Sequence, residues 1–417
     1  MRILILSDGF PPDNAGGAER IASNMYQGLR NRGHEVFVLT TTPKKSQENL
    51  GAEGIYRLYI KSYPQIWRAY LGLYNPFVVR RATKIIKTLK PEVVHAHNVH
   101  YLLSYQLLKV AKKSGAKVFL TAHDVALFHY GKLVEFLSSE SIKDAGAVKG
   151  DIKFNYQVTG WQQLKRFKKR YNPLRNILIR RYLKYVDKIF AVSQALKQAL
   201  EQNGLKNIEV IYNGIETDNW QILKPAVESF KIKYNLKEKR IIFFGGRLST
   251  LKGGKNMIEV IEQVRLQVPQ AVLLIVGQKD DQAKILMQQV KTQNLPVFFT
   301  GWLVGQDLLS AYWSSEVVVV PSLYLDPFPT INLEAMACHR PIVGTCFGGT
   351  PEIVLDNQTG FIVNPFNTKL LAEKIIYFLD NIEVAKKIGE SGYQRVNKFF
   401  SLDKQINETL IWYQKQY

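Results

Sequence analysis

Short apolar strand candidates alternate with helical stretches along the whole 417-residue chain. In the first half the strand candidates are Arg2–Leu6, Val36–Thr40, Ile55–Ile60, Val93–His97, Lys117–Thr121, Lys188–Val192 and Ile208–Tyr212. In the second half they are Arg240–Phe244, Val272–Val276, Val297–Thr300, Val317–Pro321, Ile342–Thr345 and Phe361–Val363. Strands that are separated by helices form parallel sheets rather than sandwiches or bundles, so the pattern predicts an α/β protein with two open, doubly wound parallel sheets.

Length and a turn-rich segment divide the chain into two domains. A chain of 417 residues is too long for one ordinary hydrophobic core. Residues 213–217 (Asn-Gly-Ile-Glu-Thr) end the first series of strands in turn-prone residues, which places a linker near 214–222. We therefore expect one Rossmann-like domain over residues 1–215 and a second over residues 216–399.

The positive charge of the chain is concentrated in its first half. Residues 1–215 hold 34 Lys and Arg against 15 Asp and Glu, whereas residues 216–417 hold 22 against 20. The density peaks over residues 161–188, where ten basic residues and five aromatic residues accompany one acidic residue. This segment predicts docking on an anionic membrane surface, since each Lys or Arg near such a surface contributes about 1 kcal/mol. A solvated helix face is the alternative, and nucleic acid is an unlikely partner.

Cysteine content and hydropathy indicate the compartment. The two cysteines, Cys338 and Cys346, form neither a CxxC motif nor a disulfide framework. The apolar stretch at the N-terminus is shorter than the core of a signal peptide, and no apolar run approaches the roughly 18 residues that span a bilayer. We expect a cytoplasmic protein, peripheral on the inner face of the cell membrane.

Residues suited to phosphate and sugar binding follow several of the predicted strands. Two basic residues, Arg247 and Lys252, lie in the glycine-rich loop after Arg240–Phe244. Two carboxylates separated by seven residues, Asp326 and Glu334, follow Val317–Pro321, with Thr330 expected to be the N-cap of a helix that reaches about Cys338. Further candidates follow other strands: Gly16 and Gly17, His123 and Asp124, and Gly348, Gly349 and Thr350. Ligands of open α/β sheets bind at these carboxyl ends.

Several other kinds of site are disfavoured. His95, His97 and His100 have no Cys or carboxylate at ligand spacing, so a metal site is not expected there. No GxGxxG or GxxxxGK[ST] motif follows a strand, which disfavours dehydrogenases and ATPases. Paired carboxylates by themselves are typical of glycoside hydrolases. The nearby Arg247 and Lys252 favour a diphosphate ligand instead, because Arg and Lys pair well with phosphate oxygens.

Together, these motifs resemble the retaining glycosyltransferases of family four (glycosyl transferases group 1). The likeness extends over nearly the whole chain, from Gly16-Gly17 through Asn213-Gly214-Ile215 and Glu334-Ala335-Met336-Ala337 to Pro351-Glu352. It implies the GT-B architecture, in which two Rossmann-like domains face a central cleft. It also implies that the last helix, over about residues 400–417, packs back onto the first domain.

The resemblance assigns roles to the candidate residues. Arg247 and Lys252 would hold the donor diphosphate and stabilise the charge of the leaving group. Glu334 would bind the ribose, Asp326 would contact the donor sugar, and His123 would lie over that sugar, with Asp124 setting the tautomer of His123. Gly348, Gly349 and Thr350 would present backbone N–H groups to phosphate, and Gly16 and Gly17 would let their loop approach the reacting centre. No metal is expected, because the sequence holds no Asp-x-Asp pair.

The expected function is transfer of a sugar from a nucleoside-diphosphate sugar, UDP or GDP being the most probable carriers, with retention of configuration. The second domain would bind the donor, and the basic first domain a lipid-linked acceptor or another precursor of a cell-surface glycan. No further cofactor is expected. A nucleotide-sugar epimerase, a phosphorylase and a non-catalytic nucleotide-sugar binding protein are the alternatives. The family usually has Glu and Gly where this chain has Asp326 and Pro329, so sugar choice is the property that transfers least well.

Overall fold

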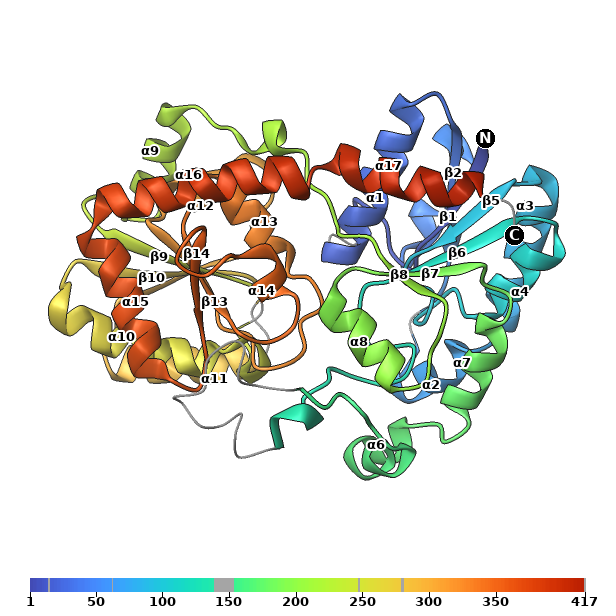
Figure 1. The fold of residues 1–417 in the computed structure, drawn as a ribbon, viewed down its shortest axis with the longest axis horizontal. Helices are drawn as coiled ribbons and strands as arrows, with labels where there is room; N and C mark the ends of the chain where they lie inside the picture. The colour runs from blue at the N-terminus through green and yellow to red at the C-terminus, as the bar shows by residue number, and fades with distance from the viewer. Residues whose placement is uncertain (14–15, 62, 139–153, 247, 279–280, 416–417) are drawn as a thin grey trace. The chain divides into compact units, whose positions relative to one another are not determined.

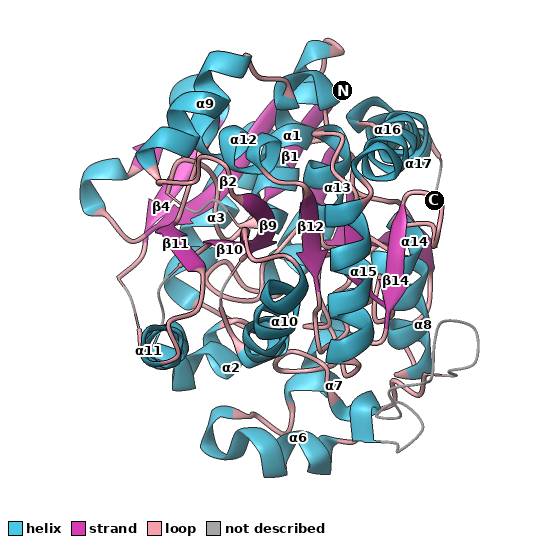
Figure 2. Cartoon of the chain, turned by 90° about the vertical axis from the view of Figure 1, so that its left-hand side faces the viewer, coloured by secondary structure: helices cyan, strands magenta, loops and turns pink. Residues whose placement is uncertain are grey.

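The computed structural model describes residues 1–13, 16–61, 63–138, 154–246, 248–278 and 281–415 (Figure 1). The chain forms two compact units. The first comprises Met1–Leu133, Asn155–Gly214 and Leu402–Tyr417, and the second comprises Val134–Phe154 and Ile215–Ser401. Each unit is built on its own sheet with helices on both faces (Figures 1 and 2).

The sheet of the first unit has the strand order β3-β4-β2-β1-β5-β6-β7-β8. Its strands are β1 (Arg2–Leu6), β2 (Glu35–Thr42), β3 (Asn49–Leu50), β4 (Ile55–Tyr59), β5 (Val93–Ala96), β6 (Lys117–Ala122), β7 (Lys188–Ala191) and β8 (Ile208–Val210). All pairings are parallel except that of β3 with β4. The predicted strands are confirmed, whereas β3 was missed because a two-residue strand carries no periodicity.

The sheet of the second unit is entirely parallel, with the strand order β11-β10-β9-β12-β13-β14. Its strands are β9 (Arg240–Gly245), β10 (Ala271–Val276), β11 (Val297–Gly301), β12 (Val317–Val320), β13 (Ile342–Thr345) and β14 (Gly360–Val363). Strand β9 comes first in the chain but lies in the middle of the sheet, with β10 on one side and β12 on the other. The carboxyl ends of β9 and β12 therefore form a topological switch point, the usual ligand position in such sheets.

Helices flank each sheet. The first unit contains α1 (Gly17–Asn31), α2 (Arg68–Leu71), α3 (Pro76–Leu89), α4 (Gln106–Lys113), α6 (Gly160–Phe167), α7 (Arg175–Leu183), α8 (Gln194–Gln202) and α17 (Leu402–Gln414). The second contains α9 (Lys224–Lys233), α10 (Gly254–Gln267), α11 (Asp281–Thr292), α12 (Gly305–Ser314), α13 (Thr330–Ala337), α14 (Thr350–Ile353), α15 (Thr368–Asp380) and α16 (Ile382–Phe399). Short 3-10 turns used below are η3 (Gln65–Trp67), η5 (Lys168–Arg170) and η7 (Thr250–Lys252).

The last helix, α17, packs on α1 of the first unit. Its Ile406 joins a buried cluster with Ile3 and Met25, and Tyr413 is fully buried in the same cluster. The Tyr413 hydroxyl also lies 2.5 Å from Nδ1 of His95. The chain therefore returns to its first sheet after completing the second.

One segment groups differently from its position in the sequence. The described residues Val134–Ser138 and Phe154 belong with the second unit, although the predicted boundary placed them in the first domain. The rings of Phe136 and Phe154 pack edge-on against Phe347, with centroids 5.6 and 5.9 Å away. Aromatic packing on Phe347 joins these residues to the second unit. The sequence pattern of strands and helices does not predict such a contact. Among the described residues, no helix is both long and apolar enough to cross a membrane.

Candidate functional site

Lys252 and Asp326 form an ion pair across the switch point of the second sheet. Lys252 ends the turn η7 after β9, and Asp326 lies in the loop between β12 and α13. The Lys252 Nζ lies 2.6 Å from Asp326 Oδ2, and the two side chains are 25% and 9% exposed. The Ser322 hydroxyl donates to the same carboxylate oxygen at 3.2 Å. Because β9 and β12 are neighbours in the sheet, residues 74 positions apart in the chain meet at one edge.

The hydroxyl of Tyr324 joins this pair. It hydrogen bonds with both Lys252 and Asp326, and the ammonium lies 5.3 Å from the centroid of the Tyr324 ring. Burial alone would lower the pKa of Lys252, but Asp326 and Tyr324 together outweigh this effect and hold the pKa above its usual value. Burial, together with the charge of Asp326, raises the pKa of Tyr324. Lys252 is thus a cation held in place by Asp326 and by Tyr324, and the sequence analysis had not connected Tyr324 with it.

Glycines allow the loops around this pair to pack closely. Gly253 has φ +82°, and a Cβ there would collide with the Pro321 carbonyl. Gly348 has φ +66°, and a Cβ would meet the Asp326 backbone. The Gly349 N–H donates to the Asp326 carbonyl at 2.9 Å. Gly349 therefore uses its N–H to fix the loop of Asp326, rather than presenting it to phosphate as the sequence analysis expected.

Glu334 lies in the helix after β12, and Thr350 lies in the helix after the neighbouring strand β13. Glu334 is buried in α13 and accepts a hydrogen bond of 2.7 Å from the Tyr312 hydroxyl of α12. Thr350 opens α14, and its hydroxyl accepts a bond of 3.2 Å from the Asn332 amide. The predicted N-cap at Thr330 was wrong by one residue: Pro329 is the N-cap, and no side chain caps the helix. Proline is suited to this first turn because it lacks the N–H that would need a partner.

His123 lies at the carboxyl end of β6 in the first unit, and its ring stacks on His97 with a nitrogen-to-nitrogen distance of 2.8 Å. Burial lowers the pKa of His123 to about 4, which keeps the ring neutral at physiological pH. Asp124 lies 3.4 Å from Nε2 of His100 and accepts the Ala126 N–H, and its role in setting the His123 tautomer stays a prediction.

Gly16 and Gly17 mark the start of α1. Gly16 is the N-cap, and Gly17 is the first helical residue. A Cβ on Gly16 would collide with the Glu19 carboxylate, which folds back over the helix terminus. Burial raises the pKa of Glu19, and the charge of Asp124 adds to this effect. The negative charge of Asp124 therefore acts on Glu19 beside Gly16 and Gly17, whose loop was expected to approach the reacting centre.

Two of the histidines that resembled metal ligands, His95 and His97, are hydrogen bonded to other side chains. His95 lies between the Tyr413 hydroxyl and the Thr121 hydroxyl, at 2.5 and 2.7 Å. Within the described ranges, no group of three or more His, Cys, Asp or Glu residues could hold a metal ion. Arg247, predicted to bind the diphosphate, lies outside the described residues.

Two protein-family models match the chain in succession. The model of Glycosyltransferase Family 4 matches residues 15–219, and that of Glycosyl transferases group 1 matches residues 227–395. Only residues 1–14, 220–226 and 396–417 are left unmatched. The chain belongs to the family 4 glycosyltransferases of group 1.

Individual proteins resemble this glycosyltransferase over different lengths. The uncharacterized glycosyltransferase MJ1607 of Methanocaldococcus jannaschii is 25% identical over 428 residues, which covers 99% of this chain and 98% of the relative. The putative glycosyltransferase YtcC of Bacillus subtilis is 29% identical over 233 residues, which covers 52% of this chain and 57% of YtcC. Anabaena Alr3699/HepE, crystallised in complex with UDP and glucose, superposes with a TM-score of 0.73 at 19% identity and covers 100% of both chains. The fold of this glycosyltransferase is therefore GT-B, with two Rossmann-like units.

The structure adds three side chains to those that the sequence predicted for the glycosyltransferase. Tyr324 and Ser322 contact the Lys252–Asp326 pair, and Tyr312 contacts Glu334. Ser322 and Tyr324 lie within four residues of Asp326, so the loop sequence contained a weak signal for them. Tyr312 had none, because it comes from a helix that precedes β12 and reaches Glu334 only through the packing of α12.

Proposed function

We propose that this glycosyltransferase moves a sugar from a UDP-sugar to a lipid-linked or other glycan acceptor, with retention of configuration and without a metal ion. The observation that carries the proposal is the buried Lys252–Asp326 pair at the switch point of the second sheet. Such a cation stabilises the negative charge that develops on a departing diphosphate. The Alr3699/HepE structure, which contains UDP and glucose, supports uridine as the base. GDP remains the alternative carrier.

The Lys252–Asp326 pair would also help to position the donor diphosphate. An ammonium has three donors, so an ion pair with Asp326 leaves capacity for phosphate oxygens. Asp326 and Tyr324 restrict the otherwise flexible lysine, which reduces the rearrangement needed when the donor binds. Glu334, held by Tyr312, would accept hydrogen bonds from a cis-diol such as a ribose. Lys252 would act on the diphosphate, with Arg247 as its proposed partner.

The absence of an Asp-x-Asp pair from the sequence supports a mechanism in which side-chain cations replace a metal. Retention rests on the family resemblance. We infer front-face attack by the acceptor, because no side chain of the motifs is an evident nucleophile. His123, neutral at physiological pH, would offer a hydrogen bond to the sugar without adding positive charge.

Membrane association is supported by the surface of the first unit. Trp67, Tyr70, Tyr74 and Phe77 are between 45% and 82% exposed. The turn η3, which ends at Trp67, lies against the basic turn η5 (Lys168–Arg170). Aromatic side chains next to exposed basic residues are typical of proteins that dock on anionic lipid. Within the predicted basic segment Arg175 does not contribute, because it is buried.

Release of UDP from UDP-sugars tests the proposal directly. Full-length protein is incubated with UDP-glucose, UDP-galactose, UDP-N-acetylglucosamine and the corresponding GDP-sugars, with and without EDTA, and nucleotide and sugar products are quantified. Slow UDP release that EDTA leaves unchanged and that Lys252→Ala lowers about 10²–10³-fold is the expected result. Lys233→Ala, which breaks an exposed pair with Asp307 in the same unit, is the matched control.

Other products would favour the alternatives. Formation of an epimeric nucleotide sugar without acceptor indicates an epimerase, and phosphate-dependent cleavage of a glycan indicates a phosphorylase. Nucleotide-sugar binding without any turnover indicates a binding protein. The anomeric configuration of the sugar released from the donor decides between retention and inversion.

A further inference from the structure

The first unit contains a polar pocket beside the loop that joins β1 to α1. Its volume is about 410 Å³, which lies within the range of small-molecule sites. Six polar residues line it: Asp13, Ser46, Gln47, Glu48, Asn49 and Arg57. None of them belongs to the residues predicted from the sequence. The pocket is therefore a feature that the known motifs leave without a function.

The position of the pocket follows from the sheet. Asp13 lies in the loop after β1, residues 46–49 follow β2, and Arg57 lies in β4. Strands β4, β2 and β1 are neighbours in the sheet and run parallel, so these residues meet at one edge of the sheet. The loop that carries Asp13 leads within three residues to Gly16 and Gly17. The pocket is thus adjacent in the chain to the loop expected to approach the reacting centre.

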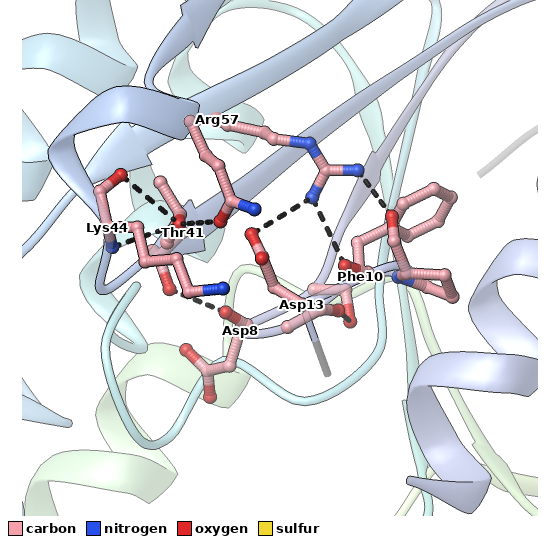
Figure 3. A network of polar contacts seen from close by, with 11 residues as sticks. Asp8, Phe10, Asp13, Thr41, Lys44 and Arg57 are labelled. Atoms are coloured by element: carbon pink, nitrogen blue, oxygen red, sulfur yellow. Dashed lines mark hydrogen bonds and ion pairs between the residues drawn. The ribbon is translucent and has the colours of Figure 1, made fainter. Parts of the chain in front are cut away.

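Arg57 holds this loop in place (Figure 3). Its Nη1 donates to the Phe10 carbonyl at 3.1 Å, and its Nη2 donates to the Pro11 carbonyl. On the other side of the loop, the Thr41 hydroxyl donates to the Asp8 carbonyl at 2.6 Å. Burial lowers the pKa of Arg57, and the charge of Asp13 partly opposes this shift. The wall of the pocket is therefore fixed before any ligand enters.

Asp13 has an unmet hydrogen-bonding capacity. Its side chain is 4% exposed and lies 4.0 Å from Nη1 of Arg57, too far for a hydrogen bond. Its Oδ2 is buried and accepts no hydrogen bond from any residue that the structure describes. A buried carboxylate oxygen without a donor is costly, and natural sites usually supply one. A ligand hydroxyl or ammonium group would satisfy it.

The charges of the lining select the class of ligand. Glu48 accepts a hydrogen bond from the Tyr59 N–H at 3.0 Å and pairs with Arg81 at 2.5 Å. Two carboxylates, Asp13 and Glu48, would repel a phosphate or carboxylate group. Ser46, Gln47 and Asn49 carry the hydroxyl and amide groups that recognise sugar hydroxyls. Lipid tails are disfavoured because the lining is polar.

We propose that this pocket binds the glycosyl ring of the acceptor, and that this ring is uncharged or carries an amino group. The inference rests on the proposed transferase function and specifies the substrate class of its acceptor side. Asp13 accepts a hydrogen bond from a ring hydroxyl or amine, and the polar side chains of residues 46–49 bind further hydroxyls. A lipid carrier, where present, remains outside the pocket at the aromatic surface of the first unit.

Binding of simple glycosides tests this assignment without knowledge of the natural acceptor. Saturation-transfer NMR is carried out on the full chain, with saturating UDP present, using methyl glucoside, methyl galactoside, methyl glucosaminide and methyl glucuronide as probes. We expect at least one neutral or amino glycoside to bind, and the glucuronide to bind at least tenfold more weakly. Ser46→Trp fills the pocket and abolishes the signal, while Asp13→Asn weakens binding at least fivefold. Ser114→Trp, at the exposed C-cap of α4, binds glycosides like the wild type.

The outcomes separate this inference from the proposed function. Thermal unfolding of each variant shows that it is folded. Failure of all neutral and amino glycosides to bind, or binding that neither Ser46→Trp nor Asp13→Asn weakens, overturns the inference. Preferential binding of the glucuronide overturns it as well. Release of UDP from donor by the wild type, measured separately, shows whether the transferase proposal stands when the pocket assignment fails.

Discussion

The Nζ of Lys252 lies 2.6 Å from Oδ2 of Asp326, at the switch point between β9 and β12. The sequence analysis assigned the lysine to the diphosphate and the aspartate to the sugar, as two separate contacts. Their pairing makes each the partner of the other before donor binds. Substitution of either residue therefore leaves the other without the partner that fixes its position.

Replacing Asp326 by Asn should lower turnover with little change in shape. The amide keeps the size of the side chain but removes the charge that fixes Lys252, so we expect kcat to fall about 10–100-fold. Lys252→Ala should cost about 10²–10³-fold, as for loss of one electrostatic stabiliser. Steady-state kinetics of donor hydrolysis measure both values. Equal kcat in Asp326→Asn and wild type would show that the pair has no part in catalysis.

A double-mutant cycle measures the energy of the pair in the folded protein. Asp326→Ala alone leaves a mostly buried ammonium without its partner and should destabilise the fold by about 3 kcal/mol. The double variant with Lys252→Ala should lose less than the sum of the single variants. Denaturant unfolding of the four proteins gives the coupling. Additive losses would mean that the interaction contributes little in solution.

Tyr312→Phe tests the support of Glu334. The substitution removes a hydroxyl that donates to Glu334 Oε2 at 2.7 Å, so the carboxylate loses one of its fixing contacts. We expect KM for the donor to rise about 3–10-fold while kcat changes by less than twofold, because the interaction would serve binding in ground state and transition state alike. A selective fall in kcat would place Glu334 in the chemical step instead.

Gly349→Ala should disrupt the loop that carries Asp326. A methyl group at this position would collide with the Pro327 carbonyl, so the loop that carries Asp326 must shift. We expect loss of about 2–4 kcal/mol of stability, in the range of steric conflicts in well-packed regions, and at least tenfold lower activity. Gly160→Ala is the control, since its new methyl meets only the Tyr171 hydroxyl, at 3.9 Å. Similar stability of the two variants would contradict the packing described here.

Stability should fall on acidification between about pH 6.5 and 4. Burial lowers the pKa of His95 to about 3 and those of His100 and His123 to about 4, from 6.5. The unfolded chain therefore binds more protons in this range, and protonation favours unfolding. Asp8 acts in the opposite sense, because burial raises its pKa from 3.8 to about 6, so its contribution is lost as the pH rises. The histidines outnumber it and should dominate.

The pH dependence of denaturant unfolding checks this prediction. His95→Gln removes one titrating ring and should reduce the slope by about 1.4 kcal/mol per pH unit. The glutamine can still hydrogen bond with Tyr413 and Thr121, so loss of these contacts is limited. An unchanged slope would show that His95 is not held neutral by the fold.

Membrane docking should depend on the aromatic side chains of the first unit. The double variant Trp67→Ser with Phe77→Ser removes two residues that are 53% and 82% exposed, and should reduce flotation with vesicles of anionic lipid at least fivefold. Leu223→Ser with Leu266→Ser, at positions of the second unit that are at least as exposed (78% and 82%), is the matched control. Flotation that is absent in the wild type, or equal in both variants, would argue against this surface as the membrane contact.

Much of the fold could be predicted because it depends on local pattern. The runs of Val and Ile in strands such as β12 and the intervening helices dictate parallel sheets, since buried parallel strands must be apolar on both faces. The motifs around Lys252, Asp326 and Glu334 also belong to strand ends that can be recognised one at a time. For these reasons the fold class was predictable from sequence, and the candidate donor-site residues could be selected there as a prediction.

Tertiary structure decided which of these groups meet. The strand order brings Lys252 to Asp326 across 74 residues, and the packing of α12 brings Tyr312 to Glu334. It also withdraws the Gly349 N–H from solvent and gathers Asp13 and Arg57 around a polar pocket. Local sequence sets the conformation of each segment through short-range sterics and hydrophobic periodicity. Contacts between distant segments depend on the order of strands in the sheet and the packing of helices on it, which periodicity within one segment does not encode.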